Sequence, residues 1–215
     1  NIFLIVNSQE MRVYTLTFFL TSLSMIFFLD LYKEDKNKIL TKNFILFSFF
    51  LFISILSHPF AIIVLTSIIV FIIIDYLFFF SNHRKVNIAL LLVSILTIGF
   101  LFHYVNYISL TKIGWIKQPD MKFFTNFYFS NFFGSRLLGV IHLLTLIVLL
   151  FYFRKKIKKN KKIILLVILL ILSYLIPMVY GYFIKPVIFP KYIIFVLIPI
   201  ILITSILVFL IENGT

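Results

Sequence analysis

Long apolar runs separated by short polar segments dominate the pattern of this sequence. A helix that crosses a bilayer needs about 20 mostly apolar residues. Seven runs come close to this length or exceed it, at 13–32, 39–57, 60–80, 87–108, 136–153, 163–183 and 192–211. The pattern therefore predicts an all-α integral membrane protein with about seven transmembrane helices.

The apolar stretch from residue 43 to residue 80 is too long for one crossing and must contain a turn. The tetrapeptide "SHPF" at 57–60 marks this turn, because proline suits the first turn of a new helix. We expect Ser57 or His58 near the helix cap. A later proline, Pro199, lies inside the last apolar run and is expected to interrupt that helix.

Composition agrees with a membrane protein, since 62% of the residues are hydrophobic and 13% are charged. Soluble domains are about half apolar and about a quarter charged. In a soluble protein the net charge of +13 would suggest nucleic acid. Here the basic residues lie between apolar runs, so we expect them to orient the chain and to contact anionic lipids. Membrane lipids are expected partners and nucleic acid is not. The sequence has no cysteine, which excludes disulfides and thiolate metal sites.

The distribution of basic residues predicts the orientation of the spans. The segments after the first, third and fifth runs, together with Lys42 near the start of the second run, carry thirteen of the twenty Lys and Arg residues. The positive-inside rule places these segments in the cytoplasm, with the N-terminus outside and the C-terminus inside. Residues near the start of the chain, the "SHPF" turn and "KPVIFPKY" at 185–192 then lie on the outer side. Chemistry there has no access to cytoplasmic nucleotide sugars or ATP.

Glu10 lies at the edge of the first apolar run, in "NSQEMRVYTLTFFL". On a helix it shares one face with residues spaced by three and four positions, namely Tyr14, Thr17, Thr21 and Ser24. We expect this polar stripe to face the helix bundle rather than lipid. Its hydroxyl residues have a structural alternative, the close packing of helices through small side chains. A carboxylate at membrane depth is a functional candidate, and we assign Glu10 a catalytic role.

Four further residues on the outer side are candidates for substrate binding. Arg12 does not face Glu10 on a helix, because residues two apart point in different directions, so a phosphate or a headgroup is its expected partner. His58 is either a helix cap or a hydrogen-bond donor to a phosphate. Lys191 and Tyr192 follow two prolines at the start of the last run. They are either interfacial anchors or the binding site of a donor phosphate.

Three segments, in order along the chain, resemble the GT-C fold membrane glycosyltransferases. The segment "NSQEMRVYTLTFFLTSLSMIFFLDLYKEDKNK" resembles a span headed by an acidic residue and a nearby Arg and followed by a basic loop. The hairpin "LFISILSHPFAIIVL" resembles one whose outer turn carries a Thr-His or Ser-His pair. The segment "FPKYIIFVLIPIILI" resembles a later span preceded by Arg or Lys and Tyr, and Lys191 stands where Arg is frequent.

This resemblance implies transfer of a sugar from a polyprenyl-phosphate donor to a glycan, lipid or protein acceptor at the outer face of the cell membrane. Protein mannosyltransferases and lipid A aminoarabinose transferases are such enzymes. The family has a further N-terminal span and a large external catalytic loop. We therefore expect residues 1–215 to be a single transmembrane domain of a larger GT-C bundle in a bacterial or archaeal cytoplasmic membrane. No cofactor is expected, and a metal requirement of the full-length protein stays open.

The expected mechanism places cationic groups near the departing lipid phosphate, because they stabilise its developing negative charge. Arg12, Lys191 and His58 are the candidates for this role. Glu10 would orient or deprotonate the acceptor hydroxyl. Two alternatives stay open, a lipid-linked sugar flippase or transporter without transfer chemistry, and a membrane scaffold in which the outer charges are incidental.

Overall fold

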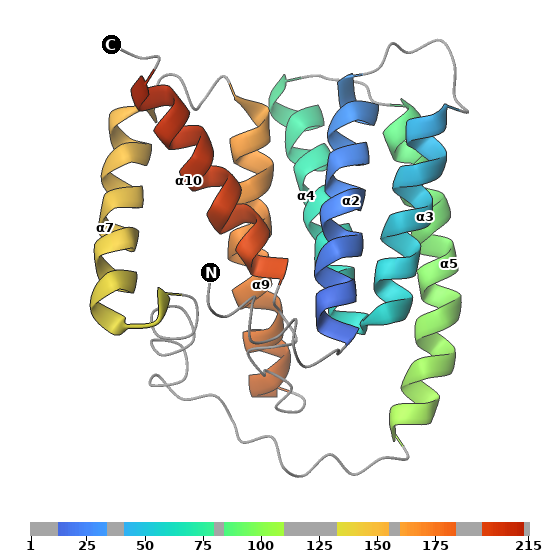
Figure 1. Ribbon diagram of the computed structural model, residues 1–215. Coiled ribbons are helices and arrows are strands. Elements are labelled where there is room, and N and C mark those ends of the chain that lie inside the picture. Colours follow the sequence, from blue (N-terminus) through green and yellow to red (C-terminus); the bar gives the residue numbers. More distant parts are fainter. Residues whose placement is uncertain are drawn as a thin grey trace. The chain divides into compact units, whose positions relative to one another are not determined.

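The computed structural model describes residues 13–33, 41–79, 84–109, 133–154, 160–183 and 195–212, with the backbone alone for residues 79, 84–85 and 101–109. In these ranges the chain forms seven α-helices and one 3-10 helix, and no β-strand (Figure 1). The helices divide between two compact units, residues 13–115 and residues 1–12 with 116–215.

The first unit contains five helical elements, which are α2 (Val13–Lys33), α3 (Lys42–Ser57), η1 (Pro59–Ala61), α4 (Ile62–Phe79) and α5 (Arg84–Ser109). The chain reverses direction between successive α-helices, so α2 and α4 run one way while α3 and α5 run the other way (Figure 1). Helix α3 packs against both α2 and α5. The end at which α2 begins therefore also holds the turn from α3 to α4.

An aromatic cluster joins three helices in the core of this unit. Phe28 of α2 is fully buried. Its ring centroid lies 5.6 Å from that of Phe47 on α3 and 6.2 Å from that of Phe71 on α4. Tyr32, one turn further along α2, also contacts Phe71 at 5.5 Å. Aromatic pairs at such separations add to the packing energy of the buried area, so this cluster fixes α2 between its two neighbours.

Small hydroxyl residues mark the buried face of α2. Thr17, Thr21 and Ser24 are at most 1% exposed. The hydroxyls of Thr21 and Ser24 donate to backbone carbonyls of the preceding turn, at Thr17 and Thr21 respectively. Their polarity is thus satisfied within the helix, and their small size allows close approach of a neighbouring helix. The prediction that this stripe faces the bundle is confirmed for these three residues.

The second unit contains the helices α7 (Arg136–Tyr152), α9 (Lys161–Phe183) and α10 (Leu197–Glu212). Helix α10 packs against α9 and α7. Ser135 caps the N-terminus of α7 by accepting a hydrogen bond from Leu138 N at 3.1 Å. Gly134 precedes this cap with φ +76°, a left-handed conformation that glycine adopts without steric cost.

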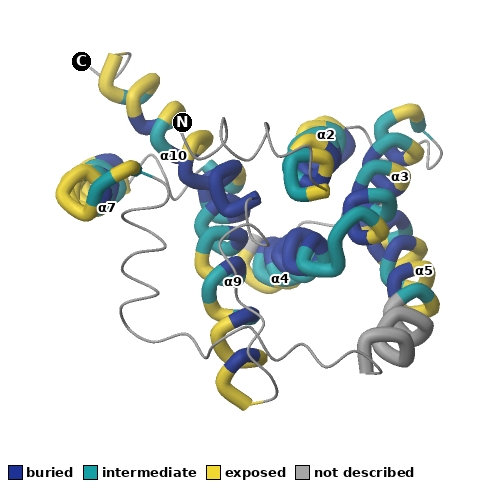
Figure 2. The backbone as a smooth tube through the Cα atoms, turned by 60° about the horizontal axis from the view of Figure 1, so that its bottom comes forward, coloured by how far each residue is buried: buried dark blue, intermediate teal, exposed yellow. Residues whose placement is uncertain are grey.

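Large apolar side chains are exposed on most of these helices. Phe19 on α2 is 57% exposed, Phe49 on α3 is 53% exposed and Ile98 on α5 is 67% exposed. Figure 2 shows that exposed and buried residues occur on the same helices. Extensive apolar exposure is unfavourable in water, whereas lipid tails are as apolar as leucine. The exposed faces are therefore those expected of helices in a bilayer.

Three of the helical segments are long and apolar enough to cross a membrane, namely Val13–Tyr32, Pro59–Phe78 and Lys161–Phe183. The other apolar helices among the described residues are shorter, Lys42–Ser57, Val86–Phe100, Arg136–Tyr152 and Leu197–Glu212. The all-helical membrane class is confirmed in this coarse form. Seven crossings and the N-outside orientation stay predictions.

The last helix differs from the expectation at Pro199. This residue occupies the third position of α10, which begins at Leu197 after a 3-10 turn at 195–196. The first four amides of an α-helix have no acceptor within the helix, so a proline there removes no hydrogen bond. Pro199 therefore lies at the start of the described helix rather than interrupting it. Pro177 is the proline in a helix interior, within α9.

A candidate site around His58

His58 ends α3 and begins η1. Its backbone is extended, with φ −155° and ψ 122°, and its amide donates to the carbonyl of Ser54 at 3.1 Å. Its ring nitrogen Nδ1 accepts a hydrogen bond from the amide of Phe60 at 3.3 Å. Pro59 then occupies the first position of η1. The prediction of a cap and a new helix at "SHPF" is thus confirmed, and His58 is the capping residue.

Side chains from α2 and η1 surround His58. The ring of Tyr14 lies 5.5 Å away between centroids and is tilted by 59°, and the ring of Phe60 lies 5.6 Å away and is stacked at 26°. Beside them the hydroxyls of Thr17 and Ser57 are 2.8 Å apart and share a hydrogen bond. These five residues form what we call the His58 cluster. It joins the start of α2 to the turn that follows α3.

Burial determines the protonation state of His58. Removal from solvent disfavours the charged imidazolium and lowers the pKa of His58 to about 4. The ring is therefore neutral near pH 7. Because Nδ1 accepts a hydrogen bond, the proton of the neutral ring belongs on Nε2. His58 can thus donate a hydrogen bond through Nε2, but it does not supply the positive charge expected of it. Arg12 and Lys191 stay the predicted sources of that charge, and both lie outside the described residues.

The other four candidates, Glu10, Arg12, Lys191 and Tyr192, lie outside the described residues. In the sequence, Arg12 immediately precedes the first residue of α2, and Tyr14 follows two positions later. Tyr14 contacts His58. The structure therefore places one of the five predicted site residues. It links that residue to the segment that directly follows Glu10 and Arg12 in the chain.

A buried carboxylate at the other end of the unit received no role from the sequence. Asp75 on α4 is 1% exposed, and its Oδ2 accepts a hydrogen bond from the hydroxyl of Tyr32 on α2 at 2.7 Å. A carboxylate inside an apolar run was the available signal, since such groups are rare and are usually paired. The sequence did not identify Tyr32 as its partner, because the two residues are 43 positions apart.

His142 on α7 was also missed. Its Nε2 lies 3.1 Å from the hydroxyl of Thr204 on α10, and its ring lies 4.5 Å from that of Phe133. The Thr204 hydroxyl donates to the carbonyl of Ile200, so it accepts from His142. This contact joins two helices of the second unit, and it lies in a different unit from His58. An imidazole within an apolar run was again the signal that could have drawn attention to it.

Among the described residues, no three His, Asp or Glu side chains are grouped so that they could hold a metal ion. The sequence matches no protein family model, no curated protein and no solved structure. Any functional assignment therefore depends on the residues themselves, and chiefly on the His58 cluster and its neighbours in the chain.

Proposed function

We propose that this membrane protein transfers a sugar from a polyprenyl-phosphate donor to an acceptor at the outer membrane face. One observation carries most weight. The neutral hydrogen-bond donor His58 contacts Tyr14, which lies four positions after Glu10 and two after Arg12 in the sequence. A carboxylate, a guanidinium and an imidazole are thus associated with the start of a single apolar helix. The resemblance of three sequence segments to GT-C enzymes adds support.

The chemistry assigns a separate task to each group. An acceptor hydroxyl attacks the anomeric carbon of the sugar, the bond to the phosphate oxygen breaks, and the acceptor proton passes to Glu10. Arg12 and Lys191 stabilise the negative charge that develops on the leaving phosphate. His58 donates from Nε2 to a phosphate oxygen or a sugar hydroxyl. Tyr192 adds a hydrogen bond to the donor phosphate. The polyprenyl chain stays in lipid among the apolar helices.

A transfer assay on the full-length protein with radiolabelled polyprenyl-phosphate sugars tests this function. We expect a glycosylated acceptor from the wild type and a loss of at least about 100-fold for Glu10→Gln, the lower range for a positioned acid–base group. Asp30→Asn is the matched control, because it removes a carboxylate from the other end of α2. Its transfer rate should equal that of the wild type.

The same reaction in sealed vesicles separates transfer from transport. A flippase would move the lipid-linked sugar to the opposite leaflet and would yield no glycosylated acceptor. Movement without transfer, or equal transfer by Glu10→Gln and the wild type at equal expression, would contradict the proposed function.

A further inference from the structure

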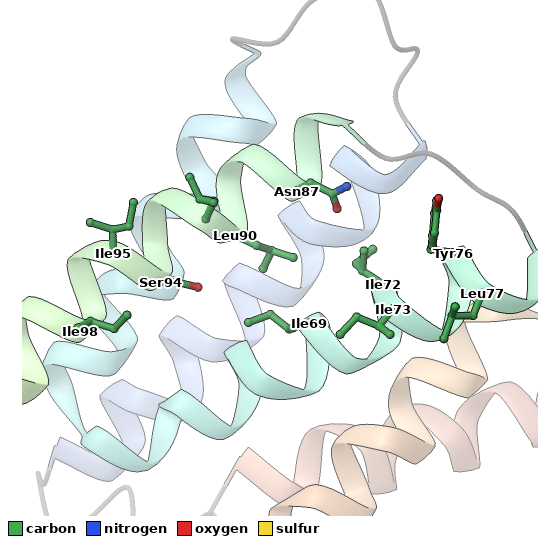
Figure 3. A pocket seen from close by; sticks show the side chains of 11 residues that line it. Ile69, Ile72, Ile73, Tyr76, Leu77, Asn87, Leu90, Ser94, Ile95 and Ile98 are labelled. Carbon is green, nitrogen blue, oxygen red and sulfur yellow. The ribbon is translucent and has the colours of Figure 1, made fainter.

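An open groove of about 690 Å³ runs between α4 and α5 (Figure 3). Branched apolar side chains from both helices form its walls, among them Ile69, Ile73 and Leu77 on α4 and Leu91, Ile95 and Ile98 on α5. Most of these side chains are strongly exposed, for example Ile95 at 61% and Leu77 at 60%. The volume falls in the range of ordinary ligand pockets, about 300–1,000 Å³. The groove thus offers room for an apolar ligand.

The two ends of the groove differ in polarity. The Tyr76 hydroxyl and the Asn87 amide lie toward one end, and Ile98 lies toward the other (Figure 3). Arg84 and Lys85 occupy the first turn of α5, and Asn87 follows Lys85 by two positions. The polar end of the groove is therefore also the basic end of α5. A ligand that complements it has an apolar tail and an anionic head.

The length of the groove fits one leaflet of a bilayer. Asn87 and Ile98 are separated by eleven positions of α5, which corresponds to about 16 Å at about 1.5 Å per residue. One leaflet contributes about half of a hydrocarbon core of about 30 Å. A single lipid chain can therefore extend along the groove while its headgroup stays at the membrane surface.

The wall residues favour a lipid chain over another helix. Helix–helix contacts in membranes use small residues that allow backbones to approach closely. The buried face of α2 has this character, with Thr17, Thr21 and Ser24. In the groove Ser94 is the small residue, among eight isoleucine and leucine side chains, Ile69, Ile72, Ile73, Leu77, Leu90, Leu91, Ile95 and Ile98. Such walls suit a flexible hydrocarbon chain.

We propose that the α4–α5 groove binds one acyl chain of an anionic phospholipid, with the phosphate headgroup at the end formed by Tyr76, Asn87 and the first turn of α5. The basic loops assign this end to the cytoplasmic side, so the lipid belongs to the cytoplasmic leaflet. This site is independent of the proposed sugar transfer, which concerns the outer face. Its lipid would hold α4 and α5 together along their exposed sides.

Native mass spectrometry of the full chain, released from vesicles of phosphatidylglycerol and phosphatidylcholine, tests this site. We expect the wild type to retain phosphatidylglycerol in preference to phosphatidylcholine. Ile95→Phe fills the groove and should abolish this retention. Leu96→Phe is the matched control, because Leu96 is an exposed neighbour on α5 outside the groove. Retention by Leu96→Phe should equal that of the wild type.

The headgroup contact has its own pair of variants. Each basic residue near anionic lipid contributes about 1 kcal/mol, or about fivefold. Arg84→Gln with Lys85→Gln should therefore lower the preference for phosphatidylglycerol by about 25-fold. The control is Lys161→Gln with Lys162→Gln, which removes two basic residues from the first turn of α9. This variant should keep the wild-type preference for phosphatidylglycerol. Two outcomes would contradict the proposed lipid site. One is a photocrosslinker at position 95 that captures protein instead of lipid. The other is equal retention of phosphatidylglycerol by Ile95→Phe and Leu96→Phe.

Discussion

The hydroxyl of Tyr32 donates a hydrogen bond to Oδ2 of Asp75 at 2.7 Å, and so connects the C-terminal parts of α2 and α4. Asp75 is 1% exposed, so the hydrogen bond forms away from solvent. A buried acceptor that loses its donor retains the cost of leaving water. The pair should therefore stabilise the first unit and favour the packing of α2 against α4.

Loss of this hydrogen bond should be measurable in unfolding experiments. We expect Tyr32→Phe to lower the free energy of unfolding by about 1 kcal/mol, in the range found for polar contacts between membrane helices. Unfolding in mixed micelles with increasing sodium dodecyl sulfate measures the change. Tyr152→Phe serves as the control, because Tyr152 is 77% exposed at the end of α7. Asp75→Asn keeps an oxygen that accepts from Tyr32 and should cost less than Asp75→Leu.

Acid should destabilise the protein through His58. The pKa of His58 is lowered to about 4 in the folded state, below its ordinary value of about 6.5. The unfolded chain therefore binds the proton first as pH falls, and stability decreases from about pH 6.5 down to about pH 4. The full loss from this residue is on the order of 3 kcal/mol, because each unit of pKa difference corresponds to about 1.4 kcal/mol. Well above pH 6.5 His58 contributes no pH dependence, because the ring is then neutral in both the folded and the unfolded chain.

His58→Asn isolates this effect in thermal unfolding between pH 4 and pH 8. Asparagine is a preferred cap and can accept the hydrogen bond from the Phe60 amide, but it does not titrate. We expect the variant to be nearly as stable as the wild type at pH 7.5 and less sensitive to acid. The same acid sensitivity in both proteins would show that His58 is not the group responsible.

The pattern of apolar runs predicts where helices lie in this sequence but not which face of each helix meets its neighbours. Each predicted apolar run contains one α-helix, and "SHPF" locates the turn at His58. Both predictions succeed because the length of an apolar run and the position of a proline are local properties of the sequence. The neutrality of His58 depends on cover from Tyr14 and Phe60, and the pairing of Tyr32 with Asp75 depends on which faces meet. When nearly every face of a helix is apolar, periodicity does not reveal these faces. The contacts between helices could therefore not be predicted from the sequence.

Orientation in the membrane can be tested by cysteine labelling, since residues 1–215 contain no cysteine. The excess of basic residues after the first, third and fifth apolar runs places residue 158 inside and residue 118 outside. In intact cells, an impermeant maleimide should label Gln118→Cys and should not label Lys158→Cys until the membrane is opened. Labelling of position 158 in intact cells would reverse the assigned orientation.

Lys191 and Tyr192 are predicted to bind the donor phosphate. Lys191→Ala should raise the donor KM and Lys191→Glu should nearly abolish transfer through repulsion, whereas Lys191→Arg should retain much of the activity. Tyr192→Phe should cost about 1 kcal/mol if one hydrogen bond is lost. Donor titration of the purified full-length variants at fixed salt measures these changes. Unchanged KM and kcat in Lys191→Ala would leave Lys191 as an interfacial anchor only.

The one-residue connection between α3 and η1 has a consequence for how the chain enters the membrane. Only His58 separates Ser57 from Pro59, so no segment is available that could leave one helix in water while the other inserts. α3 and α4 should therefore enter the bilayer together, as a preformed hairpin. We therefore predict that charge substitutions on either flank would invert both helices or neither.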